Sequence, residues 1–347
     1  MNYKKILIIK LSAIGDVIHA LPVASALKKN NPAARITWIV EKPAYDLLTN
    51  NPNIDEIILF DKKKLKSTTG LVKYGCKLSK ELRSRNFDLA LDLQGLLKSA
   101  AIAYLSRAKK RLVYCNAREL SYLVSEKVCG ENSKGHVVDR YLDVVRQLGI
   151  TIDKPHFGIN LTETEIAETK DVMVKAGLNV RDTYVVLAPG TNWPNKCWPT
   201  NYFAELAEAL YEKGFTPVVI GGTQDERLYN QIAVNIRKLP VNLTGKINLK
   251  QLAYVLKKAK AFVGGDTGPM HLAAAVNIPV IALFGPTSPE RNGPYGNNHV
   301  VLKVKHDCQG CWKRKCPKKM ECLADIHPNE VYLKVLEVIG EEKEKFR

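Results

Sequence analysis

Asp16 is the first residue whose type and position suit a chemical step. It follows the apolar run Ile6–Ile9 and a short Ser-Ala-Ile-Gly turn, and apolar residues at helical spacing come after it. A carboxylate at such a strand-to-helix turn can accept a proton from an incoming hydroxyl group. The same carboxylate can instead cap the helix, because the positive end of the helix dipole stabilises negative charge. The sequence therefore leaves two roles open for Asp16, general base or helix cap.

A second candidate site lies in the glycine- and proline-containing segment Ala188–Pro199. Small residues such as Gly190 let backbone N–H groups approach a phosphate, the Thr191 hydroxyl can donate a hydrogen bond to it, and Lys196 adds a positive charge. The segment lacks the spacing of a P-loop, and neither half of the chain opens with a G-x-G-x-x-G pattern. It therefore predicts either a phosphate site or a structural turn.

The segment Gly264–His271 carries a third candidate site, between an apolar run and an alanine-rich helical pattern. Its glycines allow the backbone to approach a ligand, and Asp266 can accept hydrogen bonds from sugar hydroxyls. A capped turn explains the same residues equally well, and a lone histidine such as His271 is more often structural than functional. The segment suits a sugar site without requiring one.

Four of the eight cysteines stand within fifteen residues, separated by two, four and five residues: Cys308, Cys311, Cys316 and Cys322. This spacing suits a tetrahedral thiolate site for zinc or iron. Four reduced structural cysteines are the alternative, and a disulfide is less expected in a cytosolic protein. The remaining cysteines show no ligand spacing: Cys76, Cys115, Cys129 and Cys197.

Two series of short apolar runs must position these segments, and each series alternates with stretches of helical spacing. Such alternation is typical of parallel sheets that helices cover on both faces. The first series consists of Ile6–Ile9, Ile36–Val40, Ile57–Phe60, Leu89–Leu93 and Leu112–Tyr114. The second series consists of Tyr184–Ala188, Val218–Ile220, Val241–Leu243, Ala261–Val263 and Val280–Phe284.

The second series starts after the charged segment Glu163–Asp182, which predicts two Rossmann-like domains, as the length of 347 residues also favours. We assign residues 1–165 to an N-terminal domain, 166–328 to a C-terminal domain and 329–347 to an amphipathic closing helix. Ligands of such sheets bind where the carboxyl ends of the strands open, so the expected ligand site is a cleft between the two halves.

Positive charge is the strongest compositional feature, with a formal net charge of +17. Residues 62–118 alone carry 15 basic and 3 acidic side chains and begin with Lys62, Lys63 and Lys64. Such a surface either faces solvent or meets anions such as phosphorylated lipid or nucleic acid. Lys10 interrupts the apolar start, which favours a buried strand over a signal peptide. No stretch approaches the ~20 apolar residues that span a bilayer, which predicts a soluble protein or one on a membrane surface.

Taken together, the motifs resemble those of the lipopolysaccharide heptosyltransferases. The segments KLSAIGDVIHALP, ALDLQGLLKSA with NAREL, PGTNWPNKCWP, and GGDTGPMHLAAA with ALFGPTSPERNGPYG follow the order and spacing of that family. The resemblance runs from about residue 4 to about residue 305, and the middle segments are more similar to heptosyltransferase I than to II. It implies an α/β GT-B fold, in which two Rossmann-like domains with parallel sheets face a central cleft, and inverting glycosyl transfer.

The resemblance also implies roles for individual residues in binding the donor. Asp16 falls on the family's catalytic base. The donor-binding positions fall on Gly190, Thr191, Asn192, Lys196, Gln224, Glu226, Asp266, Thr267, Gly268, Met270 and His271. Two of these depart from the family pattern. Asn192 stands where some members have a second threonine, and Gln224 replaces the glutamate expected to hold the donor ribose, unless Glu226 takes over that contact.

On the acceptor side, the resemblance matches Lys98 and Arg118 to basic positions of the family. We join them with Lys62, Lys63 and Lys64 as the predicted acceptor-binding residues, because a lipid A acceptor carries phosphate groups and its Kdo residues carry carboxylates. The family activity implied is transfer of L-glycero-D-manno-heptose from ADP-heptose to a Kdo residue of the lipopolysaccharide inner core, on Kdo-lipid A.

No cofactor is expected for catalysis, since the sequence lacks the D-x-D pair that holds a divalent ion under a nucleotide-sugar pyrophosphate. Zinc or iron is expected only as a structural ion at the clustered cysteines. The resemblance implies a cytoplasmic protein, peripheral on the cytoplasmic face of the bacterial inner membrane. Its expected partners are ADP-heptose, Kdo-lipid A and the anionic membrane surface.

Two alternatives stand beside this interpretation. The first is a related heptosyltransferase that acts on a later heptose of the core or on a protein. The second is a basic nucleic-acid-binding α/β protein, which explains the charge of +17 but not the ordered motifs. The chain also lacks the aromatic-basic interleaving of an RNA-binding sheet, so we expect no nucleic-acid partner.

Overall fold

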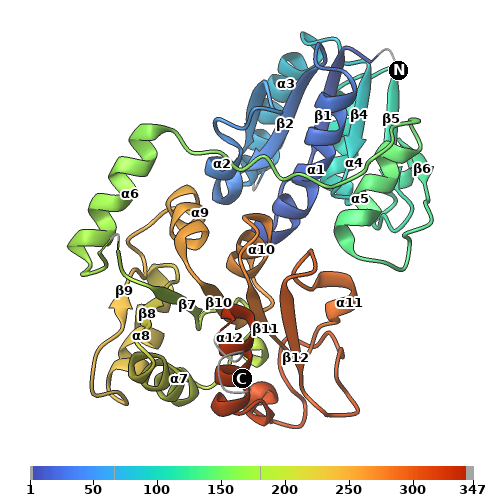
Figure 1. Ribbon diagram of the computed structural model, residues 1–347. Coiled ribbons are helices and arrows are strands. Elements are labelled where there is room, and N and C mark those ends of the chain that lie inside the picture. The colour runs from blue at the N-terminus through green and yellow to red at the C-terminus, as the bar shows by residue number, and fades with distance from the viewer. Residues whose placement is uncertain (1–2, 66, 180, 341–347) are drawn as a thin grey trace. The chain divides into compact units, whose positions relative to one another are not determined.

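The computed structural model describes residues 3–65, 67–179 and 181–340, and the chain divides into two compact units. Unit 1 is Met1–Asn160 and unit 2 is Leu161–Arg347. Each unit contains a six-stranded sheet whose strand pairs are parallel, with helices packed on it (Figure 1). The two parallel α/β sheets that the apolar runs predicted are therefore confirmed.

The sheet of unit 1 has the strand order β3-β2-β1-β4-β5-β6. Its strands are β1 (Lys5–Ile9), β2 (Arg35–Glu41), β3 (Glu56–Phe60), β4 (Leu89–Asp92), β5 (Lys110–Tyr114) and β6 (Glu126–Val128). β1 lies at the centre because it is apolar on both faces, and the successive residues Leu7 and Ile8 have no exposed surface. Ile6 is in register with Ile36 of β2 on one side and Leu89 of β4 on the other.

Helices of unit 1 cover both faces of this sheet. They are α1 (Ile14–Asn30), α2 (Lys42–Leu48), α3 (Thr68–Arg83), α4 (Leu97–Leu105) and α5 (Val137–Arg146), with the 3₁₀ turns η1 (Lys62–Leu65) and η2 (Ser121–Leu123). The chain moves along the sheet in one direction from β1 to β3 and in the other from β4 onwards, so right-handed crossovers put α1 on one face and α3 and α4 on the other. Leu7 and Ile9 accordingly share one core with Leu78 of α3 and Ile102 of α4.

The sheet of unit 2 has the strand order β12-β11-β10-β7-β8-β9. Its strands are β7 (Tyr184–Ala188), β8 (Thr216–Val219), β9 (Val241–Asn242), β10 (Ala261–Gly265), β11 (Val280–Phe284) and β12 (His299–Lys303). Its helices are α6 (Glu163–Lys175), α7 (Thr200–Glu212), α8 (Glu226–Ala233), α9 (Leu249–Lys258), α10 (Gly268–Ala275), α11 (Pro289–Asn292) and α12 (Pro328–Ile339). The 3₁₀ turns are η3 (Pro194–Lys196), η4 (Thr223–Asp225) and η5 (Cys322–Asp325).

The helix α6 belongs to unit 2 although we predicted residue 165 as the end of the first domain. It packs against α9, and the buried Lys250 ammonium lies 3.3 Å from the Glu165 carboxylate. Thr162 caps the start of α6 by accepting a hydrogen bond from the Glu165 N–H. These contacts explain why the chain divides after Asn160 rather than inside or after this helix.

The predicted closing helix forms as α12, which packs on α7 and on β10, β11 and β12. Val331 and Val335 have no exposed surface and join the core of unit 2. The helix ends at Gly340, whose φ of 86° lies in the left-handed region that glycine adopts without strain. Residues 341–347 of the predicted helix lie outside the described residues.

Trp198 connects the segment after β7 with the end of the chain. Its indole N–H donates to the Ile326 carbonyl oxygen at 2.8 Å, and its ring meets the Phe203 ring edge-on with centroids 4.8 Å apart. The core of unit 2 is therefore closed by residues that lie far apart in the sequence. Across the described residues of both units, no helix is long and apolar enough to cross a membrane.

Candidate functional site

Asp16 lies in the first turn of α1, directly after the loop that leaves the carboxyl end of β1. Its carboxylate accepts a hydrogen bond from the Ala13 backbone N–H at 3.3 Å, so it does cap the helix start. Within the described part of the chain, no salt bridge involves Asp16, and its side chain is half-buried. A carboxylate has several acceptor positions, so this cap leaves room for a hydroxyl proton.

The loop between β1 and α1 is held by a side chain from the middle motif. Gln94 Oε1 accepts hydrogen bonds from the backbone N–H groups of Leu11 at 3.1 Å and Ser12 at 3.2 Å. The buried Asp92 carboxylate fixes the turn after β4 by accepting from the N–H groups of Gln94 at 3.0 Å and Gly95 at 2.9 Å. The ends of β1 and β4 are thus tied by Gln94, a residue that the sequence analysis did not single out.

Lys10 is a buried cation at the end of β1, with only 2% of its surface exposed. Its ammonium donates to the Leu93 carbonyl oxygen at 3.1 Å and to the Tyr141 hydroxyl at 2.8 Å. Burial by itself lowers the pKa of Lys10, but Tyr141 and the charges of Asp16 and Asp92 raise it, and the net pKa lies above its ordinary value. Lys10 therefore stays charged. The sequence showed it only as an interruption of an apolar run.

Two of the predicted acceptor-binding lysines meet at one buried carboxylate. Glu41 ends β2 with its side chain 4% exposed, and it accepts from Lys62 Nζ at 3.0 Å and Lys98 Nζ at 2.9 Å. Burial alone raises the pKa of Glu41, but the two ammonium groups bring it below its ordinary value, so the carboxylate stays ionised. Sequence reasoning missed Glu41, because its two partners lie far from it in the chain.

The other predicted acceptor-binding residues lie on the surface of unit 1. Lys63 and Lys64 are exposed in η1, where Lys64 Nζ lies 3.9 Å from the Asp61 carboxylate. Arg118 is exposed after β5, and its backbone N–H donates to the Gly95 carbonyl oxygen at 2.8 Å. These three basic side chains are open to an anionic ligand, and the Lys62 side chain is also 66% exposed although its ammonium contacts Glu41.

In unit 2, the predicted donor residues Asp266, Lys196 and His271 form one ion-paired group. Asp266 directly follows β10 and is 7% exposed. Its carboxylate oxygens lie 2.6 Å from Lys196 Nζ and 3.3 Å from His271 Nε2. Burial alone raises the pKa of Asp266, but His271 and Lys196 hold it well below its usual range. The ionised carboxylate therefore orients an ammonium group at the carboxyl edge of the sheet.

The segment after β7 forms a tight turn in which glycine is required. A Cβ atom on Gly190 would lie 2.4 Å from the carboxyl carbon of Asp225. The Thr191 hydroxyl is used within the loop, where it donates to the Trp193 carbonyl oxygen at 2.6 Å, and Asn192 is exposed. The turn can offer its backbone to a ligand, whereas the Thr191 hydroxyl must change partner to bind a phosphate.

Gln224 and Glu226 are both exposed at the start of α8. Between them, the Asp225 carboxylate accepts hydrogen bonds from the Gly222 N–H at 2.9 Å and from the Gln224 amide at 3.4 Å. Asp225 is also the residue that packs against Gly190. Sequence reasoning considered its two neighbours and missed Asp225, since only the fold brings this turn beside the segment after β7.

The remaining predicted donor residues stand at the start of α10. Gly268 is the first residue of the helix, and the Thr267 hydroxyl donates to the Gly265 carbonyl oxygen at 3.2 Å. Met270 has no exposed surface, so its side chain belongs to the core of unit 2. A helix start offers backbone N–H groups without helical partners, and here they follow Asp266, which suits a polar or anionic ligand group.

The four clustered cysteines do not form the predicted metal site. In the part of the chain that the structure describes, no group of three or more His, Cys, Asp or Glu side chains is arranged to hold a metal ion. Cys322 packs against Gly285, and burial followed by Cys311, Cys308 and Cys316 raises the pKa of Cys322 to about 11. The described residues therefore do not show the tetrathiolate arrangement that the spacing suits.

A disulfide joins Cys115 and Cys129, whose Cα atoms lie 5.2 Å apart. The two residues follow the neighbouring parallel strands β5 and β6, and the Cys115 N–H donates to the Val128 carbonyl oxygen at 2.8 Å. The sequence did not indicate this pair, because the order of the strands in the sheet, rather than the spacing along the chain, brings the two sulfur atoms together.

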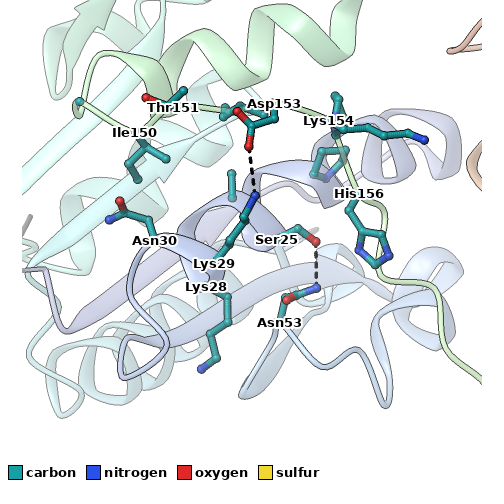
Figure 2. A pocket seen from close by; sticks show the side chains of 15 residues that line it. Ser25, Lys28, Lys29, Asn30, Asn53, Ile150, Thr151, Asp153, Lys154 and His156 are labelled. Atoms are coloured by element: carbon teal, nitrogen blue, oxygen red, sulfur yellow. Dashed lines mark hydrogen bonds and ion pairs between the residues drawn. The ribbon is translucent and has the colours of Figure 1, made fainter.

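Figure 2 shows a cavity of about 550 Å³ in unit 1, between the C-terminal half of α1 and residues 149–156. Beside it, the exposed Lys29 ammonium lies 3.2 Å from the Asp153 carboxylate, and the Asn53 amide donates to the Ser25 hydroxyl at 2.8 Å. The residues predicted for catalysis or binding are not among those that line this cavity. It lies at the opposite end of α1 from the predicted base.

Known proteins match this chain over most of its length. The sequence model of glycosyltransferase family 9 (heptosyltransferase) matches residues 76–321. Lipopolysaccharide heptosyltransferase 1 of Pseudomonas aeruginosa is 30% identical over 319 residues, which cover 90% of this chain and 87% of that protein. Lipopolysaccharide heptosyltransferase 3 of Escherichia coli K12 is 30% identical over 332 residues, which cover 93% of this chain and 91% of that protein.

Solved structures agree with these sequence matches in fold. The structure of the Escherichia coli ADP-heptose LPS heptosyltransferase II superposes with a TM-score of 0.80 at 24% identity and covers 98% of this chain and 99% of that chain. The GT-B fold class that the motifs implied is therefore confirmed.

Proposed function

Since the chain belongs to glycosyltransferase family 9, the heptosyltransferase family, we propose that it transfers L-glycero-D-manno-heptose from ADP-heptose to a Kdo residue of the lipopolysaccharide inner core. One observation carries this proposal furthest. Lys196 meets Asp266, which lies 70 residues further along the chain, and His271 at the carboxyl edge of a parallel sheet, next to a glycine turn. Such an edge is where α/β proteins bind nucleotides.

In this mechanism Asp16 accepts the proton of a Kdo hydroxyl while the hydroxyl oxygen attacks the anomeric carbon of the donor. The bond from that carbon to the pyrophosphate oxygen breaks as the new bond forms on the opposite side, so the configuration inverts and ADP leaves. Asp16 suits this role because its half-buried carboxylate accepts one backbone hydrogen bond and keeps further acceptor positions open. A positioned general base of this kind contributes about 10²–10⁴-fold to the rate.

The leaving ADP gains negative charge, and the donor loop can stabilise it. The Lys196 ammonium lies 2.6 Å from the Asp266 carboxylate, which directs it towards the end of β10. Backbone N–H groups at the Gly190–Thr191 turn and at the start of α10 supply further donors. These groups take the part that a divalent ion plays in glycosyltransferases with a D-x-D pair, which this sequence lacks.

The acceptor side of the proposal rests on unit 1. Kdo carboxylates and lipid A phosphates are anions, and Lys63, Lys64 and Arg118 are exposed cations. Lys62 and Lys98 share one carboxylate, so each ammonium keeps further N–H donors for an acceptor group. We assign acceptor binding to the N-terminal domain and donor binding to the C-terminal domain. We place the enzyme in the cytoplasm, at the cytoplasmic face of the inner membrane.

The decisive experiment incubates the protein with ADP-heptose and separate acceptors, and it reads each product by mass. The acceptors are Kdo-lipid A, a core that already carries heptose, and a mixture of cytosolic proteins. A gain of one heptose residue on Kdo-lipid A alone supports the proposal. Transfer only to the heptose-bearing core would reject the Kdo acceptor and would favour a heptosyltransferase that acts on a later heptose of the core.

A further inference from the structure

The cysteine-bearing segment 305–322, between β12 and α12, is fastened to the carboxyl edge of the unit 2 sheet. The Gly310 N–H donates to the Gly285 carbonyl oxygen at 3.0 Å, and the Trp312 N–H donates to the Pro286 carbonyl oxygen at 2.7 Å. Gly285 and Pro286 directly follow β11, which pairs in parallel with β10, the strand that leads into the predicted donor residues. Parallel strands end at the same edge of a sheet, so the segment lies at the edge that carries those residues.

The same segment contacts the loop after β7, in which Lys196 stands. The Asn195 amide, in a side chain that the protein buries, donates to the Lys313 carbonyl oxygen. The Arg314 guanidinium carbon lies 5.5 Å from the centre of the Trp193 ring, and the Lys196 ammonium lies 4.5 Å from the same centre. Both distances fall within the ~6 Å at which a cation interacts with an aromatic ring. Trp193 therefore brings one cation from each segment to the same place.

The two cations at Trp193 differ in their counter-charge. The Lys196 ammonium lies 2.6 Å from the Asp266 carboxylate, which offsets its positive charge. Arg314 is exposed and forms no ion pair with a carboxylate among the residues that the structure describes. Its segment is basic as a whole, since residues 305–322 carry 6 basic and 2 acidic side chains. The uncompensated positive charge at this edge of the sheet thus comes from Arg314 rather than from Lys196.

The charge balance at this edge matters because a nucleoside diphosphate sugar is a dianion. Lys196 and its partner Asp266 together bring little net charge to meet the two phosphate groups. A guanidinium group presents N–H donors in a planar fork that matches phosphate oxygens. An aromatic ring covers only the face of that plane, so an arginine over a ring keeps the N–H groups at its edge for a ligand. Arg314 has the charge and the donors that the pyrophosphate requires.

We propose that Arg314 is a donor-binding residue, whose guanidinium group, placed over Trp193, donates to the pyrophosphate of the nucleoside diphosphate sugar next to Lys196. The segment 305–322 then forms a wall of the donor site, and the bond from Asn195 fixes this wall to the loop after β7. The inference deepens the proposed function and rests on it, since it names a further contact to the same donor.

Calorimetric titration of the full chain with ADP, without acceptor, tests this contact. Arg314→Gln should bind ADP about tenfold to a hundredfold more weakly than the wild type, as expected for the loss of a hydrogen bond to a charged group. Adenosine, measured by its displacement of a fluorescent ADP analogue, should bind both proteins equally because it has no phosphate. Arg314→Lys keeps the charge without the planar fork and should recover part of the ADP affinity.

The matched control is Lys315→Gln, which removes the neighbouring exposed cation of the same segment. This variant should bind ADP like the wild type, because Lys315 is not placed over Trp193. Thermal unfolding of each variant shows that the fold is retained. Equal losses of ADP affinity in Arg314→Gln and Lys315→Gln would reduce the effect to the overall charge of the segment and overturn the inference.

Two further outcomes would overturn the assignment of Arg314. If Arg314→Gln binds ADP as tightly as the wild type, the guanidinium is a solvated cation. If it loses affinity for adenosine as much as for ADP, the residue shapes the loop instead of meeting the phosphates.

The proposed function can fail separately from this inference. A wild type that binds ADP through Arg314 but transfers no heptose to Kdo-lipid A contradicts the Kdo acceptor alone. A wild type that transfers heptose to Kdo-lipid A, with ADP affinity unchanged in Arg314→Gln, contradicts the role of Arg314 alone. A wild type that does not bind ADP contradicts both.

Discussion

Asp16 in unit 1 and Asp266 in unit 2 are aspartates at similar places in two similar sheets. Each follows a buried strand and precedes or begins a helix. Their surroundings differ: Asp266 is 7% exposed and paired with Lys196 and His271, while Asp16 is half-buried and accepts a single backbone hydrogen bond within the described structure. His271 and the Lys196 ammonium hold the pKa of Asp266 well below its usual range, whereas the Asp16 carboxylate keeps acceptor positions open.

The two positions therefore suit opposite tasks on the same scaffold. Asp266 holds the Lys196 ammonium in place and stays charged, whereas Asp16 is proposed to accept a proton. The same substitution, aspartate to asparagine, should separate these tasks, because it removes the charge with little change in shape. Asp16→Asn should lose catalytic rate, whereas Asp266→Asn should lose stability and donor binding.

The largest expected effect is on the rate of Asp16→Asn. Asparagine caps a helix about as well as aspartate but cannot accept a hydroxyl proton, so kcat should fall by about 10²–10⁴-fold. Thermal stability and ADP affinity should stay close to the wild type. Steady-state transfer assays at saturating substrates, together with calorimetry, measure both. A variant that keeps more than about a tenth of the wild-type kcat would leave Asp16 as a helix cap only.

Asp266→Asn should instead lower stability, since it leaves the 12% exposed Lys196 side chain without its counter-charge. Removing one partner of a buried ion pair costs about 3–5 kcal/mol of unfolding free energy. Denaturant unfolding of both variants gives the comparison. If Asp266→Asn unfolds like Asp16→Asn, the two carboxylates have equivalent surroundings and the contrast drawn here is wrong.

The pH dependence of the unfolding free energy is a second test of Asp266. The folded state holds the pKa of Asp266 below its ordinary value of about 4, so its stabilising effect is present above that pH and is lost as the pH falls towards the folded-state pKa. The unfolding free energy of the wild type should therefore decrease more steeply below about pH 4 than that of Asp266→Asn. Equal slopes for the two proteins would show that Asp266 is not held in its charged form.

Lys196→Ala should weaken donor binding and lower the transfer rate, with a smaller effect than the two aspartate substitutions. The ammonium is proposed to meet the pyrophosphate and the charge that develops on it, a contact worth on the order of 2–4 kcal/mol. Calorimetric titration with ADP and the transfer rate should both decline, while acceptor KM stays nearly constant. ADP affinity and rate equal to those of the wild type would return Lys196 to a structural role beside Asp266.

Lys63→Gln/Lys64→Gln tests the acceptor side, with a modest effect because both side chains are exposed. Exposed ion pairs contribute about 0.2–1 kcal/mol each, so the acceptor KM should rise by about twofold to thirtyfold without change in ADP affinity. The effect should shrink at high salt, where screening is strong. Lys257→Gln/Lys258→Gln, two exposed lysines of α9, is the control and should leave the acceptor KM unchanged.

Much of the fold could be predicted because strands that are buried on both faces must consist of apolar residues. The runs around Ile8 and Val186 are apolar on both faces, which only a covered parallel strand requires. The edge strands β6 and β12 were missed, since Glu126, Lys127 and His299 give no such pattern. The sheet makes these strands through pairing with one neighbour, and that pairing leaves little trace in the sequence.

The residues of the candidate site likewise divide into those that the sequence indicated and those that it did not. Asp16, Lys196 and Asp266 stand in glycine-containing motifs and could be found by type and spacing. Gln94 and Glu41 could not, because their contacts with the β1 loop and with two lysines depend on the order of the strands. The spacing of the four clustered cysteines suits a metal site, but the described residues form no group that could hold a metal ion. The cysteine spacing also gave no sign of the Cys115–Cys129 disulfide.

The closing helix has a consequence for how the protein is made. Unit 1 has its own sheet and core and can fold while synthesis of the chain continues. Unit 2 cannot complete its fold at that stage. The Trp198 indole hydrogen-bonds to the Ile326 carbonyl group, and the core of unit 2 includes Val331 and Val335, and these residues are synthesised late. During translation the loop that carries Lys196 therefore stays without its final support until these residues have left the ribosome. A nascent chain stalled before them would present a finished first half and an aggregation-prone second half.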